Sequence, residues 1–131
     1  MLKVFSGFFC FLMLAPVVSL QAQTPIERSW TILKLGLSGE KEENRAKAVD
    51  ALGLAAQKIA NDPDPRSAKA LVDAVSDEKW IVRASAISAI AQRGDPSLIS
   101  AVIPGLDDVE DSVRFNAAAA VIRLSTGKNH K

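Results

Sequence analysis

Carboxylates are the residues of this chain that lie closely enough together to suggest chemistry. The densest group is Asp107, Asp108, Glu110 and Asp111, and oxygen ligands at this spacing could hold a Ca²⁺ ion. The competing explanation is structural, because the turn before a helix collects carboxylates that cap the helix and complement its dipole. We favour the structural explanation and predict no metal site.

Other groups that catalyse reactions are few. The single histidine, His130, lies one residue from the end of the sequence, where it is a poor general base and cannot form a metal site alone. Cys10 lies in the middle of an apolar run and does not resemble a lipid attachment site. The sequence has no glycine-rich phosphate loop and no serine in a nucleophile elbow. We therefore predict no catalytic residue, no cofactor and no enzymatic activity.

The segments around these carboxylates repeat along the chain. Residues 77–91 read DEKWIVRASAISAIA and residues 108–122 read DVEDSVRFNAAAAVI, with Asp, Val and Arg in the same relative positions. Aligning Arg83 with Arg114 gives a period of 31 residues, and aligning Arg45 with Arg83 gives a longer step of 38. The chain is therefore predicted to be a short array of similar units.

Composition indicates that these units are helical. The chain is 48% hydrophobic but only 5% aromatic and has no Tyr, so its core must consist of Ala, Leu, Ile and Val, a mixture that favours helices. The length of 131 residues leaves room for one domain. We predict an all-α fold, a right-handed α-solenoid of about three helix pairs, with units at about 24–61, 62–94 and 95–127.

Local signals predict where helices begin and end. Thr24 followed by Pro25 and Glu27 is typical of a helix N-terminus with a capping box. Two prolines within residues 61–65 prevent a helix from continuing there. The sequence Gly-Asp-Pro at 94–96 ends one helix and opens the next.

The N-terminal segment differs from the array. Lys3 precedes residues 4–20, a run without charge that contains Pro16 and is followed by small and polar residues. We predict that residues 1–22 are a cleaved secretory signal peptide and that the mature protein is exported, either periplasmic or secreted. The alternative is an uncleaved membrane anchor, since about 17 apolar residues are the lower limit for spanning a bilayer.

Charge argues against two classes of partner. The chain has 16 Lys and Arg residues against 15 Asp and Glu residues, and loss of Lys3 with the signal peptide would leave equal numbers. A neutral domain with interspersed charges has no field that would attract nucleic acid or an anionic membrane. The basic tail at 128–131 is interpreted as a frayed end. Without Cys10 the mature chain would have no disulfide and no thiolate ligand.

The units resemble HEAT-type repeats, in particular the short bacterial units of about 30 residues first noted in phycobilisome lyases. The matching features are a turn Asp (Asp77, Asp108), a Val-Arg pair (Val82-Arg83, Val113-Arg114), an apolar run after this pair, and Gly-Asp-Pro between units. The first unit departs from the pattern, because Gly39 replaces the turn Asp and Asn44 replaces the Val. We interpret this unit as a degenerate cap.

The resemblance implies a structural role for the repeated charged residues. In HEAT-type repeats the turn Asp and the Arg of the following helix form hydrogen bonds within and between units. The residues assigned to this structural ladder are Asp77, Arg83, Asp108, Arg114 and Arg45. The resemblance also implies that Pro104 bends the helix in which it lies.

The resemblance further implies that the second helices of the units line a concave face. Polar positions on these helices recur in register and form a stripe. We predict a non-catalytic scaffold or adaptor that binds a protein or peptide there; a merely solvated face is the alternative. The candidate partner-binding residues are Trp80, Ser85, Ser88, Gln92, Asn116, Arg123, Lys47 and Asp50.

Trp80 is singled out because its counterparts in the other units, Glu42 and Asp111, are charged. It is expected to be either partly exposed, as binding residues often are, or packed against the prolines within residues 61–65.

Two other functions are kept as alternatives. The last helix carries Ala117 to Ala120 and then Val121, so an uncovered apolar face there would support self-association or a role as an accessory subunit of a larger envelope complex. A lyase-like activity is suggested only by the name of the repeat type.

Overall fold

The computed structural model describes residues 24–56 and 65–126. The described residues form α-helices and short 3₁₀ segments, with no strand among them. The elements are α1 (Pro25–Leu37), α2 (Glu42–Ala56), α3 (Pro65–Ala74), α4 (Trp80–Arg93), η1 (Pro96–Leu98), α5 (Ile99–Val102), η2 (Ile103–Asp107) and α6 (Asp111–Thr126). The predicted signal peptide, the basic tail and the expected unit boundary between residues 61 and 62 lie outside the described residues.

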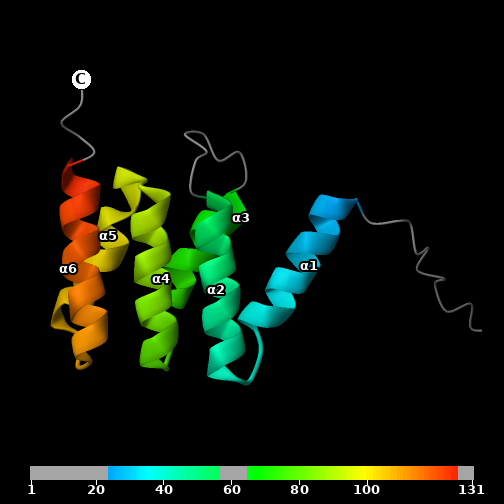
Figure 1. Ribbon diagram of the computed structural model, residues 1–131, viewed down its shortest axis with the longest axis horizontal. Helices are drawn as coiled ribbons and strands as arrows, with labels where there is room; N and C mark the ends of the chain where they lie inside the picture. The colour runs from blue at the N-terminus through cyan, green and yellow to red at the C-terminus, as the bar shows by residue number, and fades with distance from the viewer. Residues whose placement is uncertain (1–23, 57–64, 127–131) are drawn as a thin grey trace, which may run out of the picture.

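The helices form a row of pairs. In Figure 1, α2, α4 and α6 stand side by side in one layer, which we call the front layer, and α3 and α5 lie behind it. Helix α1 slants away from α2 at one end of the row, and α6 forms the other end. The prediction of an all-α solenoid is confirmed.

The helix signals at Thr24 and at residues 94–96 act as the sequence predicts. The hydroxyl of Thr24 accepts a hydrogen bond from the backbone N–H of Glu27 at 3.3 Å and caps α1. Gly94 ends α4 with φ of 71°, a left-handed conformation that a side chain disfavours. Asp95 then accepts a hydrogen bond from the N–H of Ser97 at 2.9 Å and opens the third unit.

The first helix of the third unit differs from the prediction of a bent but continuous helix. Helix α5 ends at Val102, and the chain continues as the 3₁₀ segment η2, which contains Pro104. Proline has no N–H to donate and its ring collides with the preceding turn, so the α-helix cannot continue unchanged. The tighter segment brings Gly105 against the front layer, where an added Cβ would lie 2.7 Å from Cδ1 of Ile87 and 2.9 Å from Cβ of Ala117.

The core runs along the inner side of the front layer and is built almost entirely of aliphatic side chains. Among the described helices α4 contributes the largest share of it, and α1 contributes no fully buried residue. The core residues with no more than 2% of their surface exposed are Val49, Leu52, Leu71, Val82, Ala86, Ile87, Ala89, Ile90, Val102, Val113, Ala117, Ala120 and Leu124. None of the described helices is long and apolar enough to cross a membrane.

Candidate functional site

The repeated Arg and Asp residues join neighbouring units. Arg45 donates from Nε to Oδ2 of Asp77 at 2.9 Å and from Nη2 to Oδ1 at 3.0 Å, while its Nη1 donates to the carbonyl oxygen of Gly39 at 2.9 Å. The same arrangement recurs one unit later. Arg83 donates to Oδ2 and Oδ1 of Asp108 at 2.8 and 2.9 Å, and to the carbonyl oxygen of Asp77 at 3.0 Å. Each Arg therefore binds its own turn through the backbone and the next turn through a bidentate carboxylate pair.

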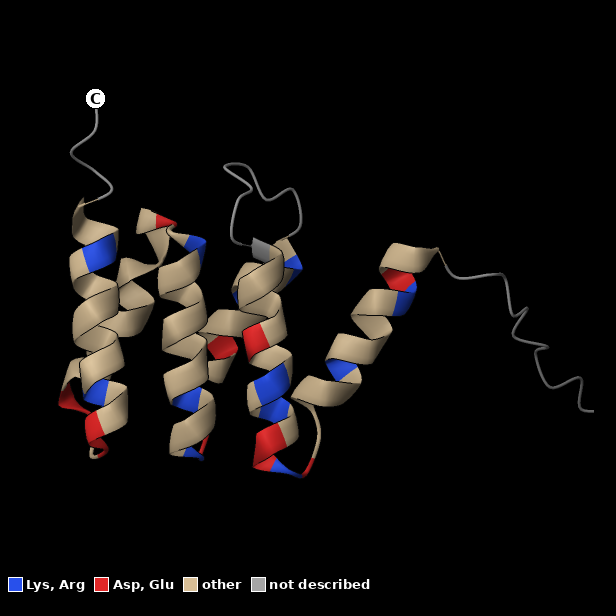
Figure 2. Ribbon diagram, viewed as in Figure 1, with Lys and Arg blue, Asp and Glu red and all other residues tan. Residues whose placement is uncertain are grey.

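The third Arg makes a different set of bonds. Arg114 donates from Nη1 to the carbonyl oxygen of Asp108 at 2.6 Å and from Nη2 to Oδ1 of Asp111 in its own helix. The side chains of Arg45 and Arg83 are 12% and 16% exposed, whereas that of Arg114 is 39% exposed. Figure 2 shows basic and acidic residues gathered near the turn ends of α2, α4 and α6.

We call the pairs Arg45–Asp77 and Arg83–Asp108 the two rungs. In both rungs the surroundings favour the charged forms of the Asp and Arg side chains. Burial would by itself raise the pKa of Asp77, but hydrogen bonds from Arg45 and from the N–H of Lys79 outweigh burial and lower it. The hydrogen bonds from Arg83 lower the pKa of Asp108 against a smaller effect of burial. The same bonds raise the pKa of both arginines. These shifts come from ion pairs between units, which accounts for them without a catalytic role.

Two carboxylates of the acidic cluster at 107–111, those of Asp108 and Asp111, are engaged in these contacts. Asp108 binds Arg83 and also accepts a hydrogen bond from the N–H of Glu110 at 3.0 Å, while Asp111 binds Arg114. Within residues 24–56 and 65–126 no group of three or more potential metal-ligating side chains comes together. Asp108 and Asp111 thus have structural partners within the protein.

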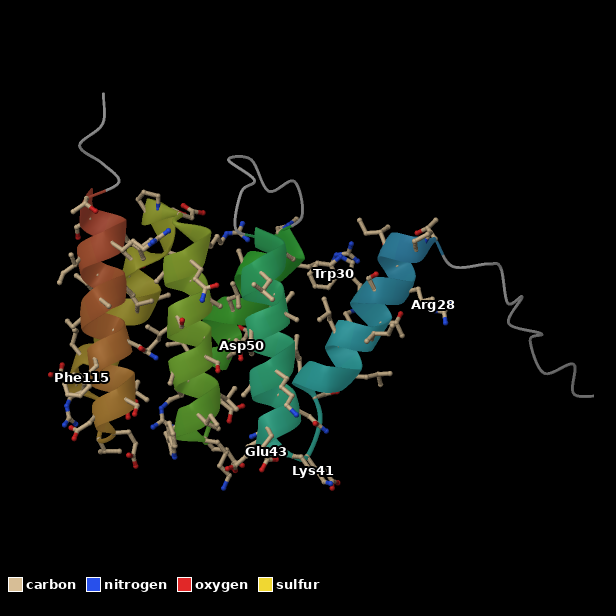
Figure 3. All side chains as sticks on the ribbon, viewed as in Figure 1. Arg28, Trp30, Lys41, Glu43, Asp50 and Phe115 are labelled. Atoms are coloured by element: carbon tan, nitrogen blue, oxygen red, sulfur yellow. The ribbon has the colours of Figure 1, made fainter. Side chains whose placement is uncertain are left out.

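All the candidate partner-binding residues except Trp80 lie in three rows that cross the helices of the front layer. The rows are Lys47, Ser85 and Asn116; Asp50, Ser88 and Ala119; and Leu54, Gln92 and Arg123. We call these nine residues the front stripe. Its positions on α2 are the most exposed, and Figure 3 marks Asp50 on that helix.

Leu54 is the member of the front stripe that sequence reasoning missed. It occupies the same register as Gln92 and Arg123, and it is 66% exposed. Counting 38 residues back from Gln92 would have identified it. An exposed Leu beside Lys47 and Asp50 gives this end of the stripe an apolar contact as well as charges.

Two members of the front stripe on α4 and one on α6 are not simply solvated. Asn116 donates from Nδ2 to the carbonyl oxygen of Ala84 at 3.2 Å and so ties α6 to α4. Ser88 and Gln92 are hydrogen-bonded to each other at 3.3 Å. Asn116 therefore has a structural partner, which the sequence pattern did not indicate.

Trp80 is 44% exposed. It is the first residue of α4 and follows the turn that connects α3 to α4. Pro65 lies at the opposite end of α3, which is ten residues long. Ten helical residues span about 15 Å, so Trp80 lies far from Pro65 along this hairpin. Pro63 lies outside the described residues.

Trp30, the one aromatic residue of α1, lies against a cation on α3. The guanidinium of Arg66 on α3 lies 4.5 Å from the ring centre of Trp30, and it also lies 3.5 Å from the carboxylate of Glu27. Figure 3 shows Trp30 on the side of α1 that faces the rest of the array. A hollow of about 250 Å³ is lined by Leu37, Arg45, Val49, Ala70, Asp73, Ala74, Asp77 and Val82. The pair of Arg45 and Asp77 thus forms part of its wall.

Helix α6 buries only part of the alanine run that suggested self-association. Ala117 and Ala120 are buried against the array, whereas Ala118 and Ala119 are exposed. The exposed apolar surface of α6 instead includes Phe115 and Ile122. Self-association through this helix stays a prediction, but with these residues rather than the buried alanines at its centre.

Comparison with known proteins agrees with this architecture. A sequence model of HEAT repeats matches residues 31–123. A HEAT repeat-containing taxis protein of Halobacterium salinarum is 38% identical over 91 residues, which make up 66% of this chain and 20% of that protein. The chain thus spans about a fifth of the relative's length. With three helix pairs joined by repeated Arg and Asp bridges, the chain belongs to the family of HEAT repeat proteins.

Proposed function

We propose that this protein is a non-catalytic scaffold or adaptor that binds a protein or peptide partner on the front stripe. The observation that carries the proposal is the register of the stripe. Nine positions recur across α2, α4 and α6, and the exposed ones among them include an apolar side chain, two cations and a carboxylate. HEAT repeats commonly mediate protein interactions, and such arrays offer extended surfaces of this kind.

The chemistry of the stripe suits an extended polypeptide. Lys47, Asp50 and Leu54 lie within two turns of α2, so a partner could make one apolar contact and two opposite charge contacts there. Gln92 and Arg123 continue the row across the next two helices. A linear partner lying across the helices would therefore contact three units at once.

Affinity capture by the full chain, in the cells that express it, tests the proposal. Two variants alter the stripe, Leu54→Asp and Arg123→Glu, and Lys69→Glu on α3 provides a matched charge change on a helix behind the front layer. We expect each stripe variant to reduce binding of the captured partner by at least about tenfold, which corresponds to ~1.4 kcal/mol. Lys69→Glu should leave binding unchanged. Equal binding by all variants would show that the front stripe is not the binding surface.

Export of the protein is a separate part of the proposal, supported by the sequence of residues 1–22 alone. It predicts that the protein is recovered outside the cytoplasm with a new N-terminus between residues 19 and 23. N-terminal sequencing of the recovered protein, with fractionation of cells, measures both. An intact Met1 on protein that sediments with membranes would favour the uncleaved anchor, and an intact Met1 in the cytosol would contradict export. The relation to phycobilisome-lyase repeats stays a prediction.

A further inference from the structure

The joints between units are closed by three positions on the front helix of the earlier unit. On α4 these are Ala84, Ile87 and Ala91, of which the first two are buried and the third is partly buried. Asn116 of α6 reaches the carbonyl oxygen of Ala84 at 3.2 Å, and the backbone at Gly105 approaches Ile87 so closely that an added Cβ would lie 2.7 Å from its Cδ1. These positions therefore face the unit that follows.

The same three positions on α2 face α4. Aligned by the step of 38 residues, they are Ala46, Val49 and Gly53, and all three are buried. An added Cβ on Gly53 would lie 2.8 Å from Cβ of Ala89 on α4. Two of the three front helices thus use these positions to bind the next unit.

On α6 the corresponding positions are exposed. Aligned by the period of 31 residues, they are Phe115, Ala118 and Ile122, which we call the outer row. Phe115 is 70% exposed and Ile122 is 66% exposed. Figure 3 shows Phe115 on the side of α6 that points away from α4. All three side chains are apolar, as are their covered counterparts on α4. Phe115 and Ile122 are larger than Ala84 and Ala91, with which they align. The outer row therefore retains the apolar composition of a joint.

Arg114 also corresponds to a residue that joins units elsewhere in the array. Arg45 and Arg83 each give Nε and Nη2 to the turn Asp of the next unit. Arg114 holds its own turn through Nη1, as the others do, but its Nη2 turns to Asp111 in the same helix. Within the part of the chain that the structure describes, no later turn supplies a carboxylate to it.

We propose that the outer row and Arg114 form a docking surface for a helix pair of another protein, one that carries an Asp or Glu in the turn before its second helix. That helix would bury Phe115 and Ile122, and the carboxylate would accept from Nε and Nη2 of Arg114 as Asp108 accepts from those atoms of Arg83. The surface continues an interface that the chain already makes twice. It is separate from the front stripe and does not depend on the proposed function.

A second copy of this chain fits the surface less well in either orientation. Stacked end to end, it would present its first unit, in which Gly39 stands at the turn position and offers no carboxylate. Paired through two antiparallel α6 helices about an axis between Ala118 and Ala119, it would place Arg114 of one copy opposite Arg123 of the other. Like charges facing each other are unfavourable. The charge of the surface therefore selects a partner with an acidic turn.

An extended chain tests this chemistry. A second copy of residues 96–126 inserted after Thr126 keeps the period of 31, so its counterpart of Asp108 falls opposite Arg114. We expect cooperative unfolding in a single transition, with a midpoint raised by about 5 °C or more. Asp108→Asn in the added copy alone should remove a large part of that rise, whereas Asp107→Asn in the added copy should not. No rise in the midpoint, or equal effects of the two substitutions, would overturn the proposal.

Light scattering of the unextended chain separates the two kinds of occupant. At micromolar concentration we expect a monomer. A dimer that Ile122→Asp dissociates and Leu54→Asp does not would assign the outer row to a second copy and overturn the proposal of another protein. Hydrogen exchange of the α6 amides gives a further readout, because docking of the added unit should slow exchange in α6 of the extended chain relative to the unextended one.

Discussion

Gly53 on α2 and Ala89 on α4 are in such close approach that a Cβ atom added to the glycine would lie 2.8 Å from the alanine Cβ and 3.0 Å from its Cα. The obstacle is the backbone of α4, which cannot turn aside as a long side chain could. Glycine in the middle of a helix costs about 1 kcal/mol relative to alanine, so its presence here is explained by the contact between the two helices.

Gly53→Val is therefore expected to lower the free energy of unfolding by about 2 kcal/mol through overpacking. Ala51→Val is the matched control on the exposed side of the same helix, where only the helix propensity changes, by roughly 0.5 kcal/mol. Urea unfolding of both variants measures the difference. If the two variants lose similar stability, the helices must separate here at little cost.

Arg83→Ala is expected to be strongly destabilising. It removes both hydrogen bonds from the guanidinium to the carboxylate of Asp108, which then keeps only the N–H of Glu110, and also the hydrogen bond to the carbonyl oxygen of Asp77. The side chains of the pair are largely buried. We expect a loss of about 2 to 4 kcal/mol. Arg83→Lys should recover only part of it, because an ammonium cannot form the two parallel bonds. Lys69→Ala removes an exposed ion pair with Asp73 and should change stability by less than about 0.5 kcal/mol.

The rungs should also make the free energy of unfolding depend on pH. The pKa of Asp77 and that of Asp108 are both lowered in the folded protein, whereas an unfolded Asp titrates near about 3.9. The stabilisation is present above the unfolded pKa and is lost as the pH falls through the folded pKa. Asp108→Asn should therefore be less stable than the parent at about pH 7, and the gap should narrow below about pH 4. A gap that stays constant over this range would contradict the assignment.

Asn116→Ala is expected to lower stability by about 1 kcal/mol, because the side-chain hydrogen bond from α6 to the carbonyl oxygen of Ala84 on α4 is lost. Arg123→Ala lies two turns further along the same helix and is exposed, so its effect should stay within about 0.5 kcal/mol. Thermal unfolding of both variants measures the contrast. An effect on partner binding without any loss of stability would instead make Asn116 a binding residue.

Helix α1 should be the least protected of the described helices in hydrogen exchange, since none of its residues is fully buried. Arg66→Ala removes the cation that lies 4.5 Å from the Trp30 ring centre and should increase exchange in α1 while leaving α4 unchanged. Lys69→Ala on the same helix is the control. Similar exchange in α1 for both variants would show that Trp30 holds the helix without the cation.

The repeat could be predicted from the sequence because its signals are periodic. Asp77 and Asp108, with the arginines one turn into the next helix, mark each unit, and the Gly-Asp-Pro at 94–96 marks the boundary. The direction of each rung could not be predicted in this way. Spacing alone does not show that Arg83 takes its carboxylate from the later turn and its carbonyl from the earlier one.

Exposure was harder to predict than secondary structure. The alanine run of α6 reads as uniformly apolar, yet which of its residues face the array depends on the packing of η2 against α4 and α6. Likewise Pro104 signals a disturbance, but only the tertiary approach of Gly105 to Ile87 shows that the chain tightens there instead of bending smoothly.

The position of the rungs also determines how the array can move. Both bidentate pairs lie at the turn end of their joints, where the turns before α2, α4 and α6 come together. When two units are joined most strongly along one edge, they move apart by rotating about that edge. The displacement is small at the joined edge and largest at the opposite ends of the helices. A partner lying across the front layer far from the turns would therefore meet a surface of adjustable width, whereas one near the turns would meet a surface of fixed spacing.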